Sequence, residues 1–190
     1  IHRLPVVDGK GALVGIVSPL DILPHVEDLD LDRTVDAVMQ RSVVPLYRRM
    51  PANVALEVMN LTGAKALPVL VDDTTVGGIL TDRDIYAQVS IDTKMVAADF
   101  GYESEEDHWT WDSLRNGMKF YYDTGRVEIP VTPIEEFMVT RPETVQEKTS
   151  VSRAAGLMHR GRFNQLPVLD PDRHLSGMVY DRYLLSVMSI

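Results

Sequence analysis

The chain contains no cysteine among its 190 residues. Disulfide bridges, thiolate zinc sites and cysteine nucleophiles are therefore excluded together. It also lacks an apolar run long enough to cross a bilayer, and no signal peptide follows Ile1. Positive charge is scarce, because 19 Lys and Arg stand against 28 Asp and Glu, for a net charge of −9. An acidic surface repels phosphate backbones, so we expect a cytoplasmic protein with no nucleic-acid or membrane partner.

Sequence motifs of catalysis are missing as well. There is no Walker loop, nucleophile elbow or metalloprotease helix. Gly9, Gly11 and Gly15 superficially suggest a dinucleotide loop, but their spacing is wrong and their context is a hairpin. Asp107 and His108 have no second histidine nearby, and we interpret the scattered His25, His159 and His174 as structural or exposed. We therefore expect no catalytic residue and no metal site.

What the chain does contain is an internal repeat. Leu-Pro-Val occurs three times, and each time a glycine follows the proline after 10 residues: Pro5 and Gly15, Pro68 and Gly78, Pro167 and Gly177. The second and third copies align without a gap at an offset of 99, which matches Met39 with Met138 and Met59 with Met158. The first copy contains only the second half of the pattern.

Each complete repeat predicts the order strand, helix, strand, strand, helix. We predict first strands at Ser42–Tyr47 and Glu143–Gln146, and a hairpin with strands Ala66–Val71 and Val76–Leu80. Apolar residues at helical spacing predict the first helix of each repeat: Ala52, Ala55, Leu56 and Met59, and Val151, Ala154, Ala155 and Met158. The last helices should begin at Pro19, Asp82 and Asp181.

We divide the chain into four parts: half of a repeat (1–30), a complete repeat (31–90), an aromatic and acidic insertion (91–130) and a second complete repeat (131–190). One such unit buries too little surface to be stable alone, so the repeats should pair through their sheets. The incomplete first copy should leave open strand edges, and we expect the chain to be part of a longer polypeptide.

Two stretches resemble the cystathionine-β-synthase (CBS) domain, which occurs in pairs called Bateman modules. They run from Gly15 through Ser18 to Asp21, and from Gly78 through Thr81 to Asp84, each after Leu-Pro-Val. The resemblance implies an α/β (α+β) fold of paired β-α-β-β-α domains. His2-Arg3 is similar to a His-Arg pair that faces nucleotide phosphates in the γ subunit of AMP-activated protein kinase. The closest overall resemblance, to archaeal proteins with four CBS repeats, pairs the two complete repeats with each other.

The resemblance implies a pocket for an adenine nucleotide (AMP, ADP or ATP) or S-adenosylmethionine as regulatory ligand. A carboxylate at a helix start, Asp21 or Asp84, can accept hydrogen bonds from both ribose hydroxyls, although it can also merely cap its helix. Ser18 and Thr81 place a hydroxyl nearby, and adenine would lie among apolar strand residues. The predicted ligand-binding set is Thr81, Arg83, Asp84, Pro45, Lys65, Ala66, Leu67, Ile79, Ser18, Asp21, His2 and Arg3.

The third repeat departs from the pattern, because Tyr180 and Tyr183 stand where Thr or Ser and Asp are expected. Tyr183 is expected to fill its own slot, while Arg182 and Asn164 remain able to reach a phosphate bound by the partner repeat. We therefore expect one good site in the pair of complete repeats.

The insertion holds 7 of the 13 aromatic residues, including Trp109 and Trp111. Ser104 and Asp107 resemble a capping box that opens a helix through Asn116. We interpret the segment as an arm whose aromatics pack over the paired repeats, with a partner-docking surface or ligand lid as the alternative.

The sequence favours a regulatory sensor over an enzyme. A nucleotide would shift the angle between repeats and so act on a protein target that the sequence does not identify. We expect a homodimer or an intramolecular disc of repeats. The alternative is a structural dimerisation module whose pockets are empty, and the tyrosines of the third repeat support it.

Overall fold

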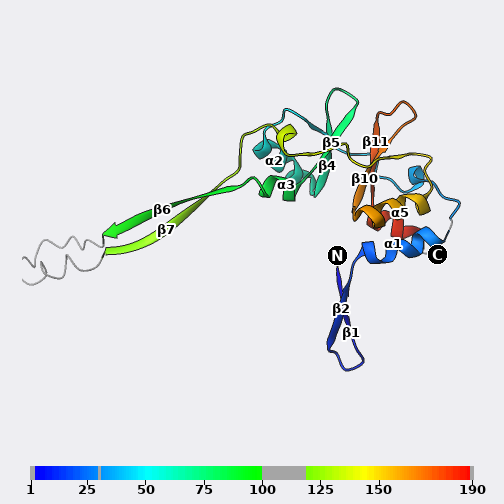
Figure 1. Ribbon diagram of the computed structural model, residues 1–190, viewed down its shortest axis with the longest axis horizontal. Coiled ribbons are helices and arrows are strands. Elements are labelled where there is room, and N and C mark those ends of the chain that lie inside the picture. The colour runs from blue at the N-terminus through cyan, green and yellow to red at the C-terminus, as the bar shows by residue number, and fades with distance from the viewer. Residues whose placement is uncertain (1–2, 30, 100–118, 189–190) are drawn as a thin grey trace, which may run out of the picture.

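The computed structural model describes residues 3–29, 31–99 and 119–188. Two complete repeats lie side by side in it (Figure 1). The second repeat consists of β3 (Leu46–Tyr47), α2 (Ala52–Thr62), β4 (Ala66–Leu70), β5 (Val76–Thr81) and α3 (Asp82–Tyr86). The third consists of β9 (Val145–Gln146), α5 (Val151–Gly161), β10 (Gln165–Leu169), β11 (Leu175–Tyr180) and α6 (Asp181–Leu185), followed by a 3-10 turn at Ser186–Met188. The predicted mixed fold and element order are confirmed.

The two repeats share one strand register. β3 and β9 pair in parallel with β4 and β10, and these pair in antiparallel fashion with β5 and β11. Pro68 lies opposite Ile79, as Pro167 lies opposite Met178. The first strands are shorter than predicted, because residues 40–43 bond elsewhere: the Val43 N–H turns back to the Arg41 carbonyl. Pro45 has no N–H to extend the ladder.

Each complete repeat buries one helix on its sheet. α2 buries Ala52, Ala55, Leu56 and Met59, and α5 buries the corresponding residues of the third repeat, Val151, Ala154, Ala155 and Met158. These are the predicted apolar stripes. Both helices end at a residue in the left-handed region, Gly63 in one repeat and Arg162 in the other.

The segments that precede the two repeats are exchanged between them. Ile134, in the short 3-10 helix Ile134–Glu136 before the third repeat, is fully buried in the core of the second repeat. Val35, in Val35–Ala37 before the second repeat, is fully buried in the core of the third. The strand β8 (Val139–Thr140) then pairs with β5, while Gln40 pairs with Met178 in the equivalent place. The repeat offset seen in the sequence is therefore also a pseudo-twofold relation in space.

The repeated glycine allows this exchange. A Cβ added to Gly177 would lie 2.5 Å from the backbone oxygen of Gln40, and one added to Gly78 would lie 3.0 Å from the backbone oxygen of Val139. Any side chain would push the exchanged strand away. Gly15 has nothing within 4 Å, because the first hairpin has no such neighbour among the described residues.

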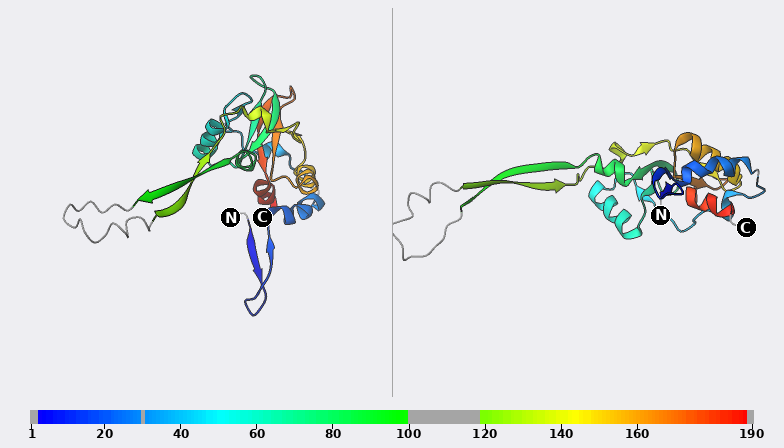
Figure 2. Two further views of the ribbon diagram at one scale, coloured as in Figure 1. Left: turned by 60° about the vertical axis from the view of Figure 1, so that its left-hand side comes forward. Right: turned by 90° about the horizontal axis from the view of Figure 1, so that it is seen from below.

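The first repeat consists of β1 (Leu4–Val7), β2 (Leu13–Val17) and α1 (Pro19–Asp28). α1 packs against α5 and α6, and its Leu23 and Val26 are fully buried in the core of the third repeat. The hairpin instead projects from the body as a two-stranded sheet (Figures 1 and 2). Its apolar side chains, such as Leu13 and Ile16, are about two-thirds exposed. It has the open edges that the missing strand and helix predict.

Residues 90–128 form an arm rather than a cover. β6 (Ser90–Asp99) and β7 (Lys119–Glu128) pair along their whole length and extend away from the repeats (Figure 2). The prediction that this segment packs over the repeats is therefore wrong for the two strands, whose backbone groups are satisfied by each other. The predicted helix from Ser104 to Asn116 lies outside the described residues. No helix in the described part of the chain has the length and apolar character of a membrane span.

Candidate functional site

The start of α3 holds a threonine and an aspartate in a fixed arrangement. The Thr81 N–H and hydroxyl both donate to Asp84 Oδ2, at 2.8 and 2.7 Å, and the Asp84 N–H donates to the Thr81 hydroxyl at 3.3 Å. This reciprocal pair is a capping box, so the helix-capping interpretation of Asp84 is correct as far as it goes. In the described part of the chain no protein group donates to Oδ1. One oxygen of a half-buried, oriented carboxylate therefore remains available to hydroxyl donors.

The exchanged strand β8 forms a second side of this region. Val139 lies opposite Ile79 on β5, two residues before Thr81, and the Arg141 N–H donates to the Gly77 carbonyl at 3.3 Å. Arg141 has a φ of 51°, a left-handed conformation that non-glycine residues rarely adopt. Sequence reasoning missed these neighbours, although the match of Met39 with Met138 pointed to the segment.

The predicted apolar residues divide between two environments. Ala66 and Ile79 are buried at the seam between the repeats, where they cluster with Met178. Leu67 is buried in the core of the second repeat, so only its backbone is left to face a ligand. The basic candidates lie outside: Lys65 is exposed and its Nζ lies 3.3 Å from Asp82 Oδ2, and Arg83 is exposed.

Pro45 belongs to a different cavity. A cleft of about 230 Å³ opens where the hairpin turns of the two complete repeats meet, next to the bridge between Thr75 and His174. Its lining consists of Arg41, Val43, Pro45, Leu70, Asp73, Thr74, His174, Leu175, Ser176 and Gly177. None of these residues belongs to the Thr81–Asp84 motif. We call this cavity the outer cleft.

The third repeat has a stacked cluster in place of the carboxylate. The rings of Tyr180 and Tyr183 meet edge to face at 5.6 Å, and the Arg182 guanidinium lies 5.2 Å and 4.9 Å from their centroids. Tyr183 Oη donates to Gln40 Oε1 at 3.3 Å. Burial raises the pKa of Tyr180. Asn164 donates to Asp181 at 2.7 Å, so its amide is already engaged.

The first repeat reproduces the second at its helix start. The Ser18 N–H and hydroxyl both donate to Asp21 Oδ2 at 2.7 Å. Asp21 and Arg3 are exposed, and His2 lies outside the described residues.

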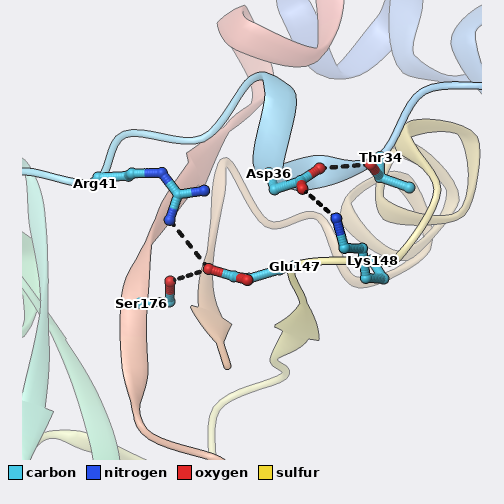
Figure 3. A network of polar contacts seen from close by, with 6 residues as sticks. All are labelled: Thr34, Asp36, Arg41, Glu147, Lys148 and Ser176. Atoms are coloured by element: carbon cyan, nitrogen blue, oxygen red, sulfur yellow. Dashed lines mark hydrogen bonds and ion pairs between the residues drawn. The ribbon is translucent and has the colours of Figure 1, made fainter. Parts of the chain in front are cut away.

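A polar network holds the exchanged segment that precedes the second repeat (Figure 3). Lys148 donates to Asp36 at 2.7 Å, and Arg41 donates to Glu147 at 3.1 Å. Hydrogen bonds from Lys148 and then Thr34 lower the pKa of Asp36, and the same Asp36 raises the pKa of Lys148. Hydrogen bonds from Ser176 and then Arg41 lower the pKa of Glu147. Arg48 and Glu135, 3.7 Å apart, occupy the equivalent place in the other repeat.

The hairpin turn of the third repeat carries the one group of potential metal ligands found in the described residues. One donor atom each from Asp170, Asp172 and His174 lies within 4.8 Å of the others. Asp170 Oδ1 already accepts the His174 N–H at 2.8 Å, and the turn is largely exposed. We assign no metal to it.

Comparison with known proteins agrees with this architecture. The family model of the CBS domain matches residues 1–28, 35–90 and 134–190. A CBS domain-containing protein of Dictyostelium discoideum is 27% identical over 154 residues, which are 81% of this chain and 90% of that protein. Inosine-5'-monophosphate dehydrogenase of Methanocaldococcus jannaschii is 36% identical over 109 residues, 53% of this chain but only 21% of the enzyme.

Solved structures show the same fold. Protein MJ1225 of Methanocaldococcus jannaschii, a proposed archaeal homologue of g-AMPK, has a TM-score of 0.71 at 18% identity; the match covers all of this chain and 60% of MJ1225. CBSX2 in complex with AMP has a TM-score of 0.56 at 20% identity, over 82% of this chain and 95% of CBSX2. The CBS pair of MJ0100, in complex with 5-methylthioadenosine and S-adenosyl-L-methionine, has a TM-score of 0.55 at 17% identity, over 82% of this chain and 95% of that one. The chain belongs to the CBS domain family.

Proposed function

We propose that the chain is a regulatory module that binds an adenosine-type nucleotide, AMP, ADP, ATP or S-adenosylmethionine, at the start of α3. The observation that carries the proposal is the oriented Asp84 carboxylate with a free Oδ1 beside β8. Two hydroxyls of a ribose are suitable donors for such an oxygen, and charged acceptors make the stronger hydrogen bonds. CBSX2 and MJ0100, which share the fold, are known in complex with adenosine compounds.

The other residues have distinct parts in the proposed site. Thr81 holds Asp84 in orientation, and the backbone of Ala66 and Ile79 reads the edge of adenine. Lys65 and Arg83 supply positive charge for phosphates. Pro45 is withdrawn from the set, because it lines the outer cleft.

The exchange of segments suggests how the ligand acts. A nucleotide between β5 and β8 touches both the second repeat and the segment that leads into the third. It shifts the arrangement of the repeats only if it binds one arrangement more tightly than another. The proposed output is regulation of a partner protein or of a second copy of the chain, without catalysis.

A structural dimerisation module is the second candidate function. It is favoured by one observation, the Tyr180, Arg182 and Tyr183 cluster that stands where the third repeat would bind ribose. In that case neither repeat of the pair binds a nucleotide.

Calorimetric titration with each of the four ligands, on the unaltered chain and on two variants, tests the proposal. Asp84→Asn keeps the size and the acceptor for Thr81 but removes the charge. It should weaken nucleotide binding at this site at least about tenfold, because hydrogen bonds to charged groups are worth roughly 1.5–3 kcal/mol. The matched control is Asp73→Asn in the outer cleft, which should leave affinity unchanged.

The outcomes separate the alternatives. Loss of binding in Asp73→Asn but not in Asp84→Asn would move the ligand to the outer cleft. No binding of any of the four compounds by the folded, unaltered chain would favour the dimerisation module.

A further inference from the structure

A carboxylate and two basic side chains from different repeats lie together where the first repeat meets the third. α1 inserts Leu23 and Val26 into the core of the third repeat, which fixes its position against α5. Nδ1 of His159, in the last turn of α5, lies 3.4 Å from the Leu20 carbonyl oxygen. Because Leu20 directly precedes Asp21, the end of α5 lies against the start of α1.

The charges at this junction act on each other. Hydrogen bonds from the Ser18 hydroxyl and N–H lower the pKa of Asp21 most, and the positive charges of His159 and Arg162 lower it further. Asp21 Oδ2 accepts both Ser18 bonds, and no group in the described residues donates to Oδ1. The arrangement at Asp21 is therefore that of Asp84, with basic side chains from another repeat added.

Arg162 has a free guanidinium. The neighbouring Arg160 donates to Glu27 Oε1 at 2.7 Å, which ties α5 to α1. Within the described ranges no hydrogen bond or ion pair engages the side chain of Arg162. Its backbone is left-handed, with a φ of 54°, where the second repeat has Gly63 with a φ of 66°. The third repeat thus keeps an arginine at a position that favours glycine.

We infer that the third repeat supplies the phosphate-binding half of a second nucleotide site, in which Asp21 accepts hydrogen bonds from ribose hydroxyls and His159 and Arg162 hold the phosphate. The inference rests on the proposed function, and it narrows the ligand of this site to an adenosine nucleotide with at least one phosphate. A carboxylate alone would repel a phosphate, whereas a guanidinium binds one through two parallel hydrogen bonds. The third repeat, which lacks a carboxylate at Tyr183, would then serve the site of the first.

The test uses the full chain with Asp84→Asn, so that the site of the second repeat is silenced. Calorimetry with AMP should still detect one bound nucleotide per chain. Adding Arg162→Gly should weaken AMP binding about tenfold or more and leave adenosine binding unchanged, because only the phosphate contact is removed. Glycine suits the left-handed backbone, so the urea midpoint should stay equal or rise, which excludes unfolding as the cause. Arg153→Ala, an exposed arginine on the same helix, is the charge-matched control and should change nothing.

Three results would overturn the inference. One is an Asp84→Asn chain that binds no AMP while the unaltered chain binds it, in which case the proposed function survives alone. Another is an unchanged AMP affinity after Arg162→Gly. The third is an unaltered chain that binds no nucleotide, which removes the proposed function and this site with it.

Discussion

Replacing Ile134 by alanine should destabilise the second repeat, although Ile134 precedes the third repeat in the sequence. The side chain is fully buried in the core formed by Leu46, Met59, Leu80 and other residues of the second repeat. Truncating a buried isoleucine to alanine costs roughly 2–5 kcal/mol, from lost transfer energy and the cavity left behind. We expect about 3 kcal/mol, a large share of the roughly 5–15 kcal/mol that stabilises a domain.

Hydrogen exchange read by mass spectrometry locates the effect, and urea unfolding measures its size. Protection should fall in residues 46–86 and persist in residues 145–185, if the two cores open separately. Val131→Ala is the matched control, because Val131 lies in the same segment but is 74% exposed. A loss of protection in the third repeat, or an unfolding free energy within about 0.5 kcal/mol of the unaltered chain, as for ordinary surface substitutions, would refute the exchange of segments.

Two further predictions concern the same exchange. Gly177→Ala should lower the unfolding free energy by about 2 kcal/mol, within the range for overpacked sites, because its Cβ would meet the Gln40 backbone oxygen at 2.5 Å. Gly15→Ala, with open space around it, should cost much less by the same urea assay; equal losses would contradict the steric reason. Glu147→Gln should flatten the acid side of the stability curve. The Ser176 and Arg41 contacts lower the pKa of Glu147, so their stabilisation is present at neutral pH and is lost as pH falls through the folded-state pKa, below the ordinary 4.5. Identical urea midpoints against pH for both chains would show that the network contributes nothing.

The candidate site was predictable where its residues are close in sequence. Thr81 and Asp84 are three residues apart, and a capping box at that spacing forms from local backbone geometry alone. Pro45 was wrongly grouped with them because its place depends on residues from both hairpin turns. The neighbours on β8 and the pairing of Asp21 with His159 and Arg162 join residues that are far apart in the chain, so no spacing rule could find them.

The arm shows a different limit. Its aromatic and acidic composition suggested a cover over the repeats, but composition does not say which surface a segment contacts. The backbone of β6 and β7 satisfies its hydrogen bonds within the arm and therefore needs no contact with the body.

The sequence by itself determined the repeat, the order of its elements, the helix starts at Pro19, Asp82 and Asp181, and the family. These depend on local periodicity, capping and turn chemistry, which act within about ten residues. Only the tertiary structure decided which repeat receives Ile134 and Val35, and why Gly78 and Gly177 must lack side chains. Such choices follow from the close packing of segments distant in sequence, where the position of each surface is set by its partner.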